Sequence, residues 1–443
     1  MNTPICDFLA SYASSSPVRM HMPGHKGATE ADAHDLTEIV GADCLFVADG
    51  IIGESEKNLS TLYGADSFYS TEGSSLSIRT ALYLLALYAK EKGVKPLILS
   101  ARNAHRAFIS AAVLIDFDVE WLVGGSDYLS SGLTAELLEA RLASGERPVA
   151  VYITSPDYLG GTVDIEAIAK VCHKYGTFLM VDNAHGAYLK FLSPSRHPMD
   201  LGADISVDSA HKTLHALTGA GYLHLNPNLD PFFKTRVKEA MALFASTSPS
   251  YLILESMDRV NAYLADGFRR DLQELITKTD AIKRKLTDFG YVLVGDEPMK
   301  ITIKPKPFGY TGKALAERLQ KRNIYVEFFD PDHLTLMPSV ATRDEDLACL
   351  ADALLSLERR PAIAGSAPAF ETPTRVLSPR EATMAPSTLL PVDKCIGKIL
   401  SETSVFCPPA VPMIVSGERI EGDLVPALAY YGVSELRVLK DEA

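Results

Sequence analysis

Apolar and polar positions along the first half of the chain follow two different periods. Between residues 74 and 92, apolar side chains such as Leu76, Leu82 and Leu85 recur at three- and four-residue steps, which predicts a long helix ending near Gly93. Short apolar runs then alternate with further helical patterns. We expect strands at 96–100, 119–123, 149–154, 177–182 and 204–208, and helices at 105–114, 134–142 and 164–175.

This alternation of strands and helices predicts an α/β fold with a mostly parallel sheet covered by helices, because parallel neighbours need crossover connections. A second, smaller α/β pattern follows residue 290, with strands expected at 299–305, 324–330 and 333–338 and helices at 311–322 and 344–357. The first 60 residues read as irregular, and 359–392 read as a linker rich in Pro, Ala and Ser. We expect an N-terminal segment (1–60), a large cofactor-binding domain (61–285), a small α/β domain (286–360), and a linker with a C-terminal lobe (361–443).

Composition narrows the class of protein. The 443 residues carry a formal net charge of −13, which makes nucleic acid an unsuitable partner. An acidic surface could attract cationic substrates, but solubility alone is the stronger explanation for the charge. The six cysteines form no CxxC pair, so we expect no metal site and no disulfide framework. The longest apolar stretch, 81–89, is too short to span a bilayer, and the N-terminus lacks a signal-peptide pattern, so we expect a cytoplasmic protein.

Chemically active side chains occur where predicted strands end. Asp182 is the last residue of the strand TFLMVD, and the segment DSAHKTL places Ser209, His211 and Lys212 directly after the strand DISVD. The segment TEGSS precedes the long helix, so Gly73 with Ser74 and Ser75 lies where helix N–H groups point outward. In open parallel sheets, ligands bind beyond the carboxyl ends of the strands.

These three features together are what pyridoxal 5'-phosphate (PLP) requires. Its phosphate binds at a helix N-terminus with hydroxyl donors, its ring nitrogen needs a carboxylate, and its aldehyde needs a lysine amine. Each feature alone has an ordinary explanation: a surface lysine for Lys212, a turn or capping residue for Asp182, and helix capping for the Gly-Ser-Ser segment. His105, after the strand 96–100, would lie over the cofactor ring or else end a helix in the core.

The motifs that carry these residues resemble the Orn/Lys/Arg decarboxylases, a branch of the fold type I PLP enzymes. The resemblance extends over most of the chain, with nine motifs in the expected order. They are HMPGHKG (21–27), HDLTEIVGADCL (34–45), STEGSSLSIRTAL (70–82), ARNAHRAF (101–108), TSPDYLGGTVDI (154–165), VDNAHGAY (181–188), SAHKTL (209–214), STSPSY (246–251) and VPMIVSGERI (411–420).

The resemblance implies a role for each matching position. Lys212 would be the Schiff-base lysine and Asp182 the partner of the ring nitrogen, with His105 on one face of the ring and Ala184 on the other. The catalytic set would be Lys212, Asp182, His105 and His211, with His211 or Lys212 as proton donor to the substrate. The remaining residues that would bind the cofactor are Gly73, Ser74, Ser75, His185, Ser209, Thr247 and Ser248. Thr247 and Ser248 would come from the partner chain, because the family's site lies at a dimer interface; we expect a homodimer or a higher even oligomer.

Three departures from the family pattern affect the substrate more than the cofactor. Asn183 follows Asp182 where the family usually has Glu, Glu72 stands where it usually has Asn, and Cys44 interrupts the expected acidic pair near Asp43. A basic amino acid needs a carboxylate at the far end of its pocket. Asp43, Glu54 and Glu72 are the candidates, with helix capping or solvent exposure as the ordinary alternatives.

The resemblance therefore implies a decarboxylase that converts lysine, ornithine or arginine to the corresponding amine. The pyridine Asp and the Schiff-base Lys are shared by all PLP enzymes of this fold, so an aminotransferase or another lyase is the alternative. A regulatory homologue without catalysis is a further alternative, and the presence of Lys212, Asp182 and His105 argues against it.

Overall fold

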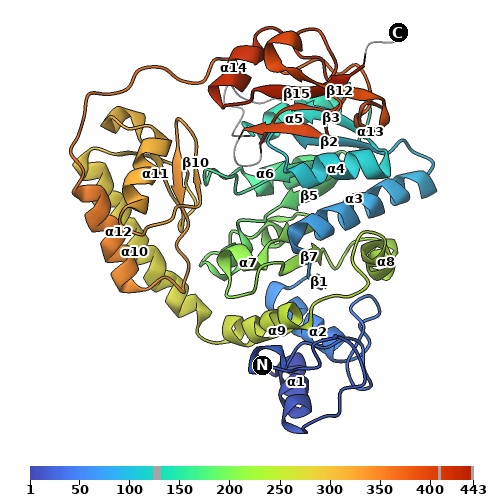
Figure 1. Cartoon of the computed structure of the whole chain (residues 1–443). Coiled ribbons are helices and arrows are strands. Elements are labelled where there is room, and N and C mark those ends of the chain that lie inside the picture. Colours follow the sequence, from blue (N-terminus) through green and yellow to red (C-terminus); the bar gives the residue numbers. More distant parts are fainter. Residues whose placement is uncertain (123–130, 408–410, 441–443) are drawn as a thin grey trace. The chain divides into compact units, whose positions relative to one another are not determined.

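The computed structural model describes residues 1–122, 131–407 and 411–440 (Figure 1). Its helices are α1 Pro4–Ser14, α2 Ile51–Tyr63, α3 Gly73–Glu91, α4 Arg106–Ile115, α5 Ala135–Ser144, α6 Ile165–Lys174, α7 Ala210–Thr213, α8 Pro231–Ala242, α9 Tyr251–Ala265, α10 Phe268–Phe289, α11 Gly312–Gln320, α12 Asp344–Leu355, α13 Pro379–Met384 and α14 Leu424–Tyr430. Its strands are β1 Asp66–Ser70, β2 Leu97–Ala101, β3 Asp118–Leu122, β4 Ala150–Thr154, β5 Phe178–Asp182, β6 Ile205–Asp208, β7 Gly221–Leu225, β8 Val292–Val294, β9 Ile301–Lys304, β10 Phe328–Phe329, β11 Leu334–Leu336, β12 Ser387–Pro391, β13 Ser404–Cys407, β14 Val411–Val415 and β15 Glu435–Leu439.

The largest sheet has seven strands in the order β1-β7-β6-β5-β4-β2-β3. Strands β5 and β6 run parallel, with Asp182 opposite Val207, and β2 and β3 also run parallel. Strand β7 is antiparallel to both β6 and β1. The predicted α/β class with a large, mostly parallel sheet is confirmed.

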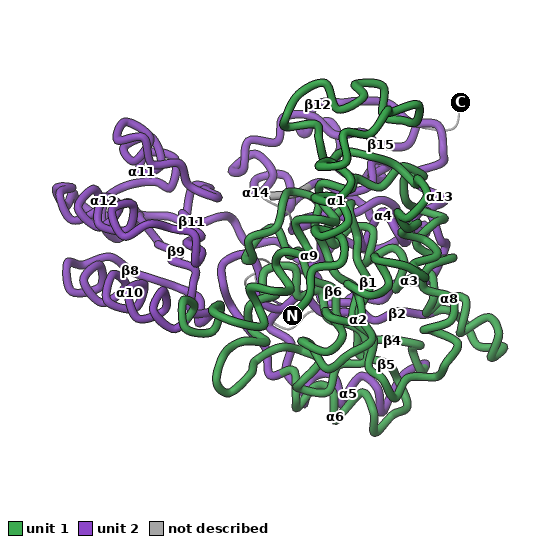
Figure 2. Tube along the Cα trace, turned by 90° about the horizontal axis from the view of Figure 1, so that it is seen from below, with its two compact units in different colours: residues 1–96, 147–151, 165–272 green, residues 97–146, 152–164, 273–443 purple. Residues whose placement is uncertain are grey.

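The chain forms two compact units (Figure 2). The first comprises residues 1–96, 147–151 and 165–272, and the second comprises 97–146, 152–164 and 273–443. The four predicted domains remain a prediction.

Helix α3 is central to the first unit. Its buried side chains include Leu76, Leu82 and Leu85, which were expected from the spacing of apolar positions, and it packs against β7, β6 and α8. The helix ends at Glu91, Lys92 is its C-cap, and Gly93 follows in the left-handed region with φ +68°. Glycine suits this position because it has no Cβ to clash there.

The second unit contains smaller sheets. A four-stranded antiparallel sheet, in the order β10-β11-β9-β8, packs with α11 and α12. Two-stranded sheets, β12-β15 and β13-β14, belong to the C-terminal part, whose buried residues include Leu400, Met413 and Leu436.

Three expectations about secondary structure were wrong. The first 60 residues are not irregular throughout, because α1 and α2 lie there. The linker expected at 359–392 contains α13 and β12, and only 328–329 form a strand within the expected 324–330.

The N-terminal N–H groups of α1 (Ile5 and Cys6) donate to Asp258, a carboxylate more than 250 residues away along the chain, so local patterns could not reveal this cap.

Within the described residues, no helix combines the length and the apolar character needed to cross a membrane.

Candidate active site

The ends of β5 and β6 bring the predicted acid and the predicted lysine to the same edge of the sheet. Asp182 ends β5, is only 1% exposed, and accepts a hydrogen bond from the Ala184 N–H at 3.2 Å. Lys212 lies in α7, the short helix that follows β6. Its Nζ is 3.1 Å from Nε2 of His185, three residues after Asp182. The loop after β5 therefore contacts the predicted Schiff-base lysine directly.

The start of α3 forms a cradle suited to a phosphate group. Ser74 and Ser209 are buried and their hydroxyl oxygens are 2.9 Å apart, which joins the first turn of α3 to the end of β6. Glycine is required beside this turn: a Cβ added to Gly221 would lie 2.6 Å from the carbonyl carbon of Gly73 and 2.9 Å from the amide nitrogen of Ser74. Ser75 is half-buried in the same turn.

His211 borders this cradle. A Cβ added to Gly73 would lie 3.6 Å from its Cε1. Its Nδ1 is 2.8 Å from the Ala220 carbonyl oxygen, which can only accept, so the ring proton is on Nδ1 in the neutral imidazole.

For three predicted site residues, the role at the cofactor remains a prediction. His105 belongs to the second compact unit, where it caps α4 and its Nδ1 accepts the Ala107 N–H at 3.2 Å. This is the helix-terminal position considered from the sequence, and its place over a cofactor ring remains a prediction. Thr247 and Ser248 are exposed in the connection between α8 and α9, and their role toward a partner chain also remains a prediction.

The structure separates the three acidic candidates for reading the substrate side chain. Asp43 is 6% exposed, and its Oδ2 accepts the N–H groups of Gly50, Ile52 and Gly53 at the start of α2. The capping alternative therefore holds for Asp43. Glu72 accepts the Ser246 N–H at 2.6 Å, and Glu54 accepts from the Asn2 amide.

A cluster of fully buried polar side chains lies behind the strand ends and was not found from the sequence. Asp208, the last residue of β6, accepts from the Asn183 amide at 2.7 Å, and its other oxygen is 3.0 Å from His197 Nε2 and 3.3 Å from His224 Nε2. All of these side chains are inaccessible to solvent. The only sequence signal was the position of Asp208, at a strand end beside Ser209.

Among the described residues, His197, Asp208 and His224 are the one group with metal-ligating atoms close enough to hold an ion. The hydrogen bonds favour another explanation. His197 Nδ1 accepts the Met199 N–H, so Nε2 carries the ring proton and donates to Asp208 instead of presenting a lone pair to a metal.

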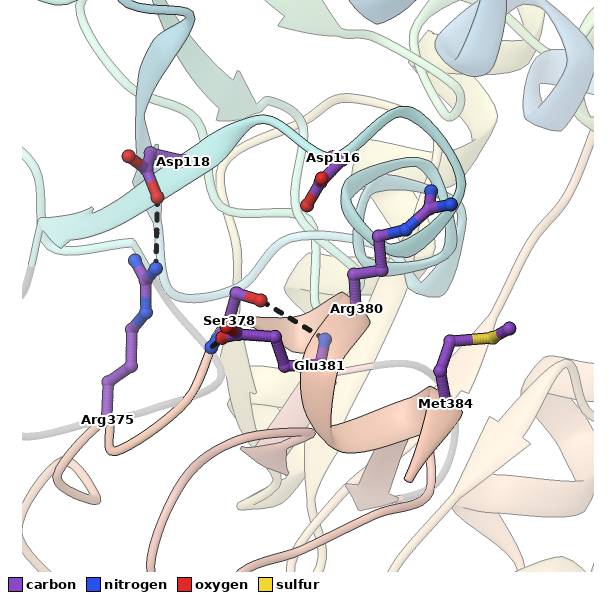
Figure 3. A pocket seen from close by; sticks show the side chains of 7 residues that line it. All are labelled: Asp116, Asp118, Arg375, Ser378, Arg380, Glu381 and Met384. Carbon is purple, nitrogen blue, oxygen red and sulfur yellow. Dashed lines mark hydrogen bonds and ion pairs between the residues drawn. The ribbon is translucent and has the colours of Figure 1, made fainter. Parts of the chain in front are cut away.

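A separate cavity of about 580 Å³ lies in the second unit (Figure 3). Its lining side chains are Asp116, Asp118, Arg375, Ser378, Arg380, Glu381 and Met384. Several of them are already engaged: Arg375 donates to Asp118, and Arg380 donates to the Val113 and Leu114 carbonyls in the last turn of α4. The cavity contains none of the predicted site residues, and its two arginines fasten α13 and the segment before it to α4 and β3.

The residues present fit pyridoxal phosphate. The cradle of Ser74 and Ser209 offers hydroxyl groups and helix N–H groups to a phosphate, and the added-Cβ distances at Gly221 show that only glycine fits there. A buried acid and a lysine amine are available from the neighbouring strand ends. Fold and site thus define a PLP enzyme of fold type I.

Comparisons with known proteins agree with that class. The model of the Orn/Lys/Arg decarboxylase major domain matches residues 3–302, and the chain belongs to this family. It is similar to "Uncharacterized protein YaaO" of Bacillus subtilis (29% identity; 97% of this chain and 94% of the relative) and to "Arginine decarboxylase" of Bacillus subtilis (26% identity; 94% and 91%). Among solved structures, lysine decarboxylase A from Pseudomonas aeruginosa has a TM-score of 0.83 at 17% identity, covering 99% of this chain and 80% of that one.

Proposed function

We propose that this protein is a cytoplasmic PLP-dependent decarboxylase that removes the α-carboxylate of lysine, ornithine or arginine and supplies the resulting amine to polyamine metabolism. The relatives named as arginine and lysine decarboxylases support this substrate class. The observation that carries the proposal is the convergence of Lys212 and the Asp182 loop beside the cradle of Ser74 and Ser209.

Each residue has a defined task in this proposal. Lys212 would hold the cofactor covalently through Nζ, and Asp182 would keep the ring nitrogen protonated. Ser74, Ser209 and the first N–H groups of α3 would bind the phosphate. When bound, the cofactor supplies an electron-accepting ring that takes up the electron pair left as CO₂ departs. The buried carboxylate of Asp182 would act by keeping the ring nitrogen positively charged, so that the ring can accept those electrons.

The contact between Lys212 and His185 allows proton transfer from the lysine to the histidine. A lysine amine must be neutral to bond to an aldehyde carbon, and an ammonium group can pass its proton only to a nearby acceptor. His185 Nε2, 3.1 Å from Lys212 Nζ, is such an acceptor. His211 would exchange a proton through Nε2, because its Nδ1 donates to the Ala220 carbonyl.

We further propose a homodimer or a higher even oligomer in which Thr247 and Ser248 complete the partner's phosphate site. Both residues are exposed in this chain, as the shared site requires. Of the three acidic candidates, Glu54 and Glu72 remain for contact with the substrate, because Asp43 already caps α2 with its carboxylate.

The experiment that tests the function has two readouts. The protein is incubated with pyridoxal phosphate and reduced with borohydride, and peptide mass spectrometry locates the modified lysine. We expect Lys212 to carry it, the Lys212→Ala variant to carry none, and the Lys234→Ala control, which removes an exposed lysine paired with Asp66, to behave as wild type. Modification at a different lysine would contradict the proposal.

The second readout identifies the reaction. Lysine, ornithine and arginine are each incubated with the holoenzyme, and the CO₂ and the organic product are measured. We expect CO₂ and one amine in equal amounts, and loss of both in Lys212→Ala. A keto acid without CO₂ would instead indicate an aminotransferase.

A further inference from the structure

One buried hydrogen bond joins the two strand ends that carry the predicted cofactor residues. Asn183 follows Asp182 at the end of β5, Asp208 precedes Ser209 at the end of β6, and the Asn183 amide nitrogen donates to Asp208 Oδ1 at 2.7 Å. The Asn183 backbone N–H also donates to the Val207 carbonyl at 2.9 Å. The side-chain bond thus continues the parallel pairing of β5 and β6 one step beyond the last strand residues.

Asp208 is a fully buried anion with its own stabilising partners. Burial by itself raises the pKa of Asp208, but the neighbouring His197 and His224 outweigh burial and hold that pKa below its ordinary value. His197 donates to Oδ2, and its ring is fixed in turn by the Met199 N–H. Burial lowers the pKa of His224, against the opposing effect of Asp208, so His224 is neutral near pH 7.

Exchanging either side chain alone weakens the pair. A carboxylate at 183, as in the resembled family, would face the carboxylate of Asp208 across a hydrogen-bond distance, and two buried like charges at that distance repel strongly. An amide at 208 alone could pair with Asn183 only through a neutral amide–amide hydrogen bond, which is weaker than the charge-assisted bond that Asp208 accepts. The chain therefore carries its acid on β6 and its amide on β5.

We propose that Asp208, acting through Asn183, is a positioning residue that fixes the loop of Asp182 and His185 relative to Ser209 and Lys212. This inference rests on the proposed function, since it assigns the pair to the cofactor site. The negative charge of Asp208 is bonded to the Asn183 amide, and Asp182 remains the acid for the ring nitrogen.

The test is an exchange of the two side chains. Asp208→Asn should weaken pyridoxal phosphate binding about tenfold or more, the typical effect of losing a buried charge-assisted hydrogen bond. The double variant N183D/D208N restores the bond, because the amide introduced at position 208 can donate to the carboxylate introduced at position 183 and still accept from His197. Binding is measured by absorbance titration, and we expect the double variant to recover most of the affinity that Asp208→Asn loses. Equal affinity of wild type and Asp208→Asn would overturn the proposal.

The exchange also distinguishes the effect of the hydrogen bond from the effect of where the negative charge lies. In N183D/D208N the buried charge moves next to Asp182, so the pH at which the bound cofactor's absorbance changes should shift even though affinity is recovered. If the pair had a purely structural role, N183D/D208N would have both the cofactor affinity and the pH of the absorbance change of wild type. Asn183→Ala provides a second variant that keeps the pair of Asp208 with His197, and it should weaken binding in the same direction as Asp208→Asn.

The matched control is Asp204→Asn. Asp204 immediately precedes the same strand, is buried, and pairs with His173 at 3.0 Å and with the Leu179 N–H at 2.7 Å. We expect Asp204→Asn to leave cofactor affinity unchanged, and an affinity loss equal to that of Asp208→Asn would contradict a specific role. If wild type itself binds no pyridoxal phosphate, the proposed function fails; if it binds and the Asp208 and Asn183 variants bind equally well, only this inference fails.

Discussion

At the scale of single residues, two buried aspartates show how environment decides the state of a carboxyl group. Asp208 is held ionised by His197 and His224. Asp157 is 6% exposed, and burial raises its pKa from 3.8 to about 6, against the opposing effects of the Gly161 N–H and Lys300. The surroundings of the carboxyl group therefore stabilise the ionised form of Asp208 and destabilise the ionised form of Asp157.

Asp157 gives a prediction for the pH dependence of stability. The folded state binds the Asp157 proton more tightly than the unfolded state, so this group makes the free energy of unfolding fall as pH rises from about 4 to about 6. Above that window the penalty is on the order of 3 kcal/mol. Asp157→Asn keeps an oxygen for the Leu159 and Gly161 N–H groups and removes the penalty.

The measurement is the difference in melting temperature between Asp157→Asn and wild type across pH 4 to pH 8. We expect the melting temperature of the variant to increase relative to that of wild type as pH rises to about 6, and the difference to stay constant above that pH. A difference independent of pH would show that Asp157 titrates as an ordinary carboxyl group.

Gly221 gives a prediction for the cofactor cradle. A methyl group there would press on the backbone of Gly73 and Ser74, which has to shift. We expect Gly221→Ala to weaken pyridoxal phosphate binding about tenfold, in line with the cost of overpacking a close contact. Gly422→Ala is the control, because a Cβ at Gly422 meets nothing within 4 Å. Titration of both variants with pyridoxal phosphate measures this effect. Equal affinities of Gly221→Ala and Gly422→Ala would rule out the cradle at this position.

At the scale of elements, a buried ion pair holds the C-terminal part to β2. Arg102, directly after β2, donates to both oxygens of Glu418 at 2.6 and 2.7 Å and to the Met413 carbonyl at 3.2 Å. Its guanidinium also lies 4.7 Å from the centre of the Trp121 ring. Arg102 and Glu418 belong to two of the motifs recognised in the sequence, ARNAHRAF and VPMIVSGERI, which explains why widely separated segments share a motif set.

Removing one member of this pair should be costly. Arg102→Ala leaves the Glu418 carboxylate buried without its partner, and such a change costs about 3–5 kcal/mol. The double variant R102A/E418A should lose less than the sum of the two single variants, because no isolated charge remains. Chemical denaturation of the four proteins measures this, and additive losses would mean that the two side chains act independently.

At the scale of the whole molecule, exposed apolar side chains favour self-association. Large apolar residues are exposed on the segment between α1 and α2: Val18, Met20, Met22, Val40 and Val47. Exposed apolar side chains gathered on one segment mark an interaction surface. The shared active site proposed above requires such a surface in the same compact unit as Lys212.

The corresponding prediction concerns oligomeric state. We expect wild type to sediment as a dimer or a larger even oligomer. The variant M20E/V40E should dissociate at a higher protein concentration than wild type, and its affinity for the cofactor should fall as it dissociates. Met384→Glu, at an exposed methionine on α13, is the control and should leave both unchanged. A monomeric wild type in analytical ultracentrifugation would reject the shared site.

Much of the fold could be predicted because it depends on local periodicity. The expected strand 177–182 corresponds to β5 and the expected helix 74–92 to α3, since the side chains that repeat along each element face one core. The missed helices α1 and α2 are capped by carboxylates outside the helices themselves: Asp258, far along the chain, caps α1, and Asp43, in the loop before α2, caps α2. A periodic pattern contains no record of such partners.

The sequence by itself determined the fold class, the family and the order of the chemical groups, because strand ends, turn glycines and motif spacing are local properties of the chain. The tertiary structure alone decided which groups meet. It placed His185 against Lys212, engaged Asp43 at the start of α2, and joined Asn183 to Asp208. The contacts of His185 with Lys212 and of Asn183 with Asp208 join residues 25 to 27 positions apart, and the parallel pairing of β5 and β6 brings them within hydrogen-bond reach.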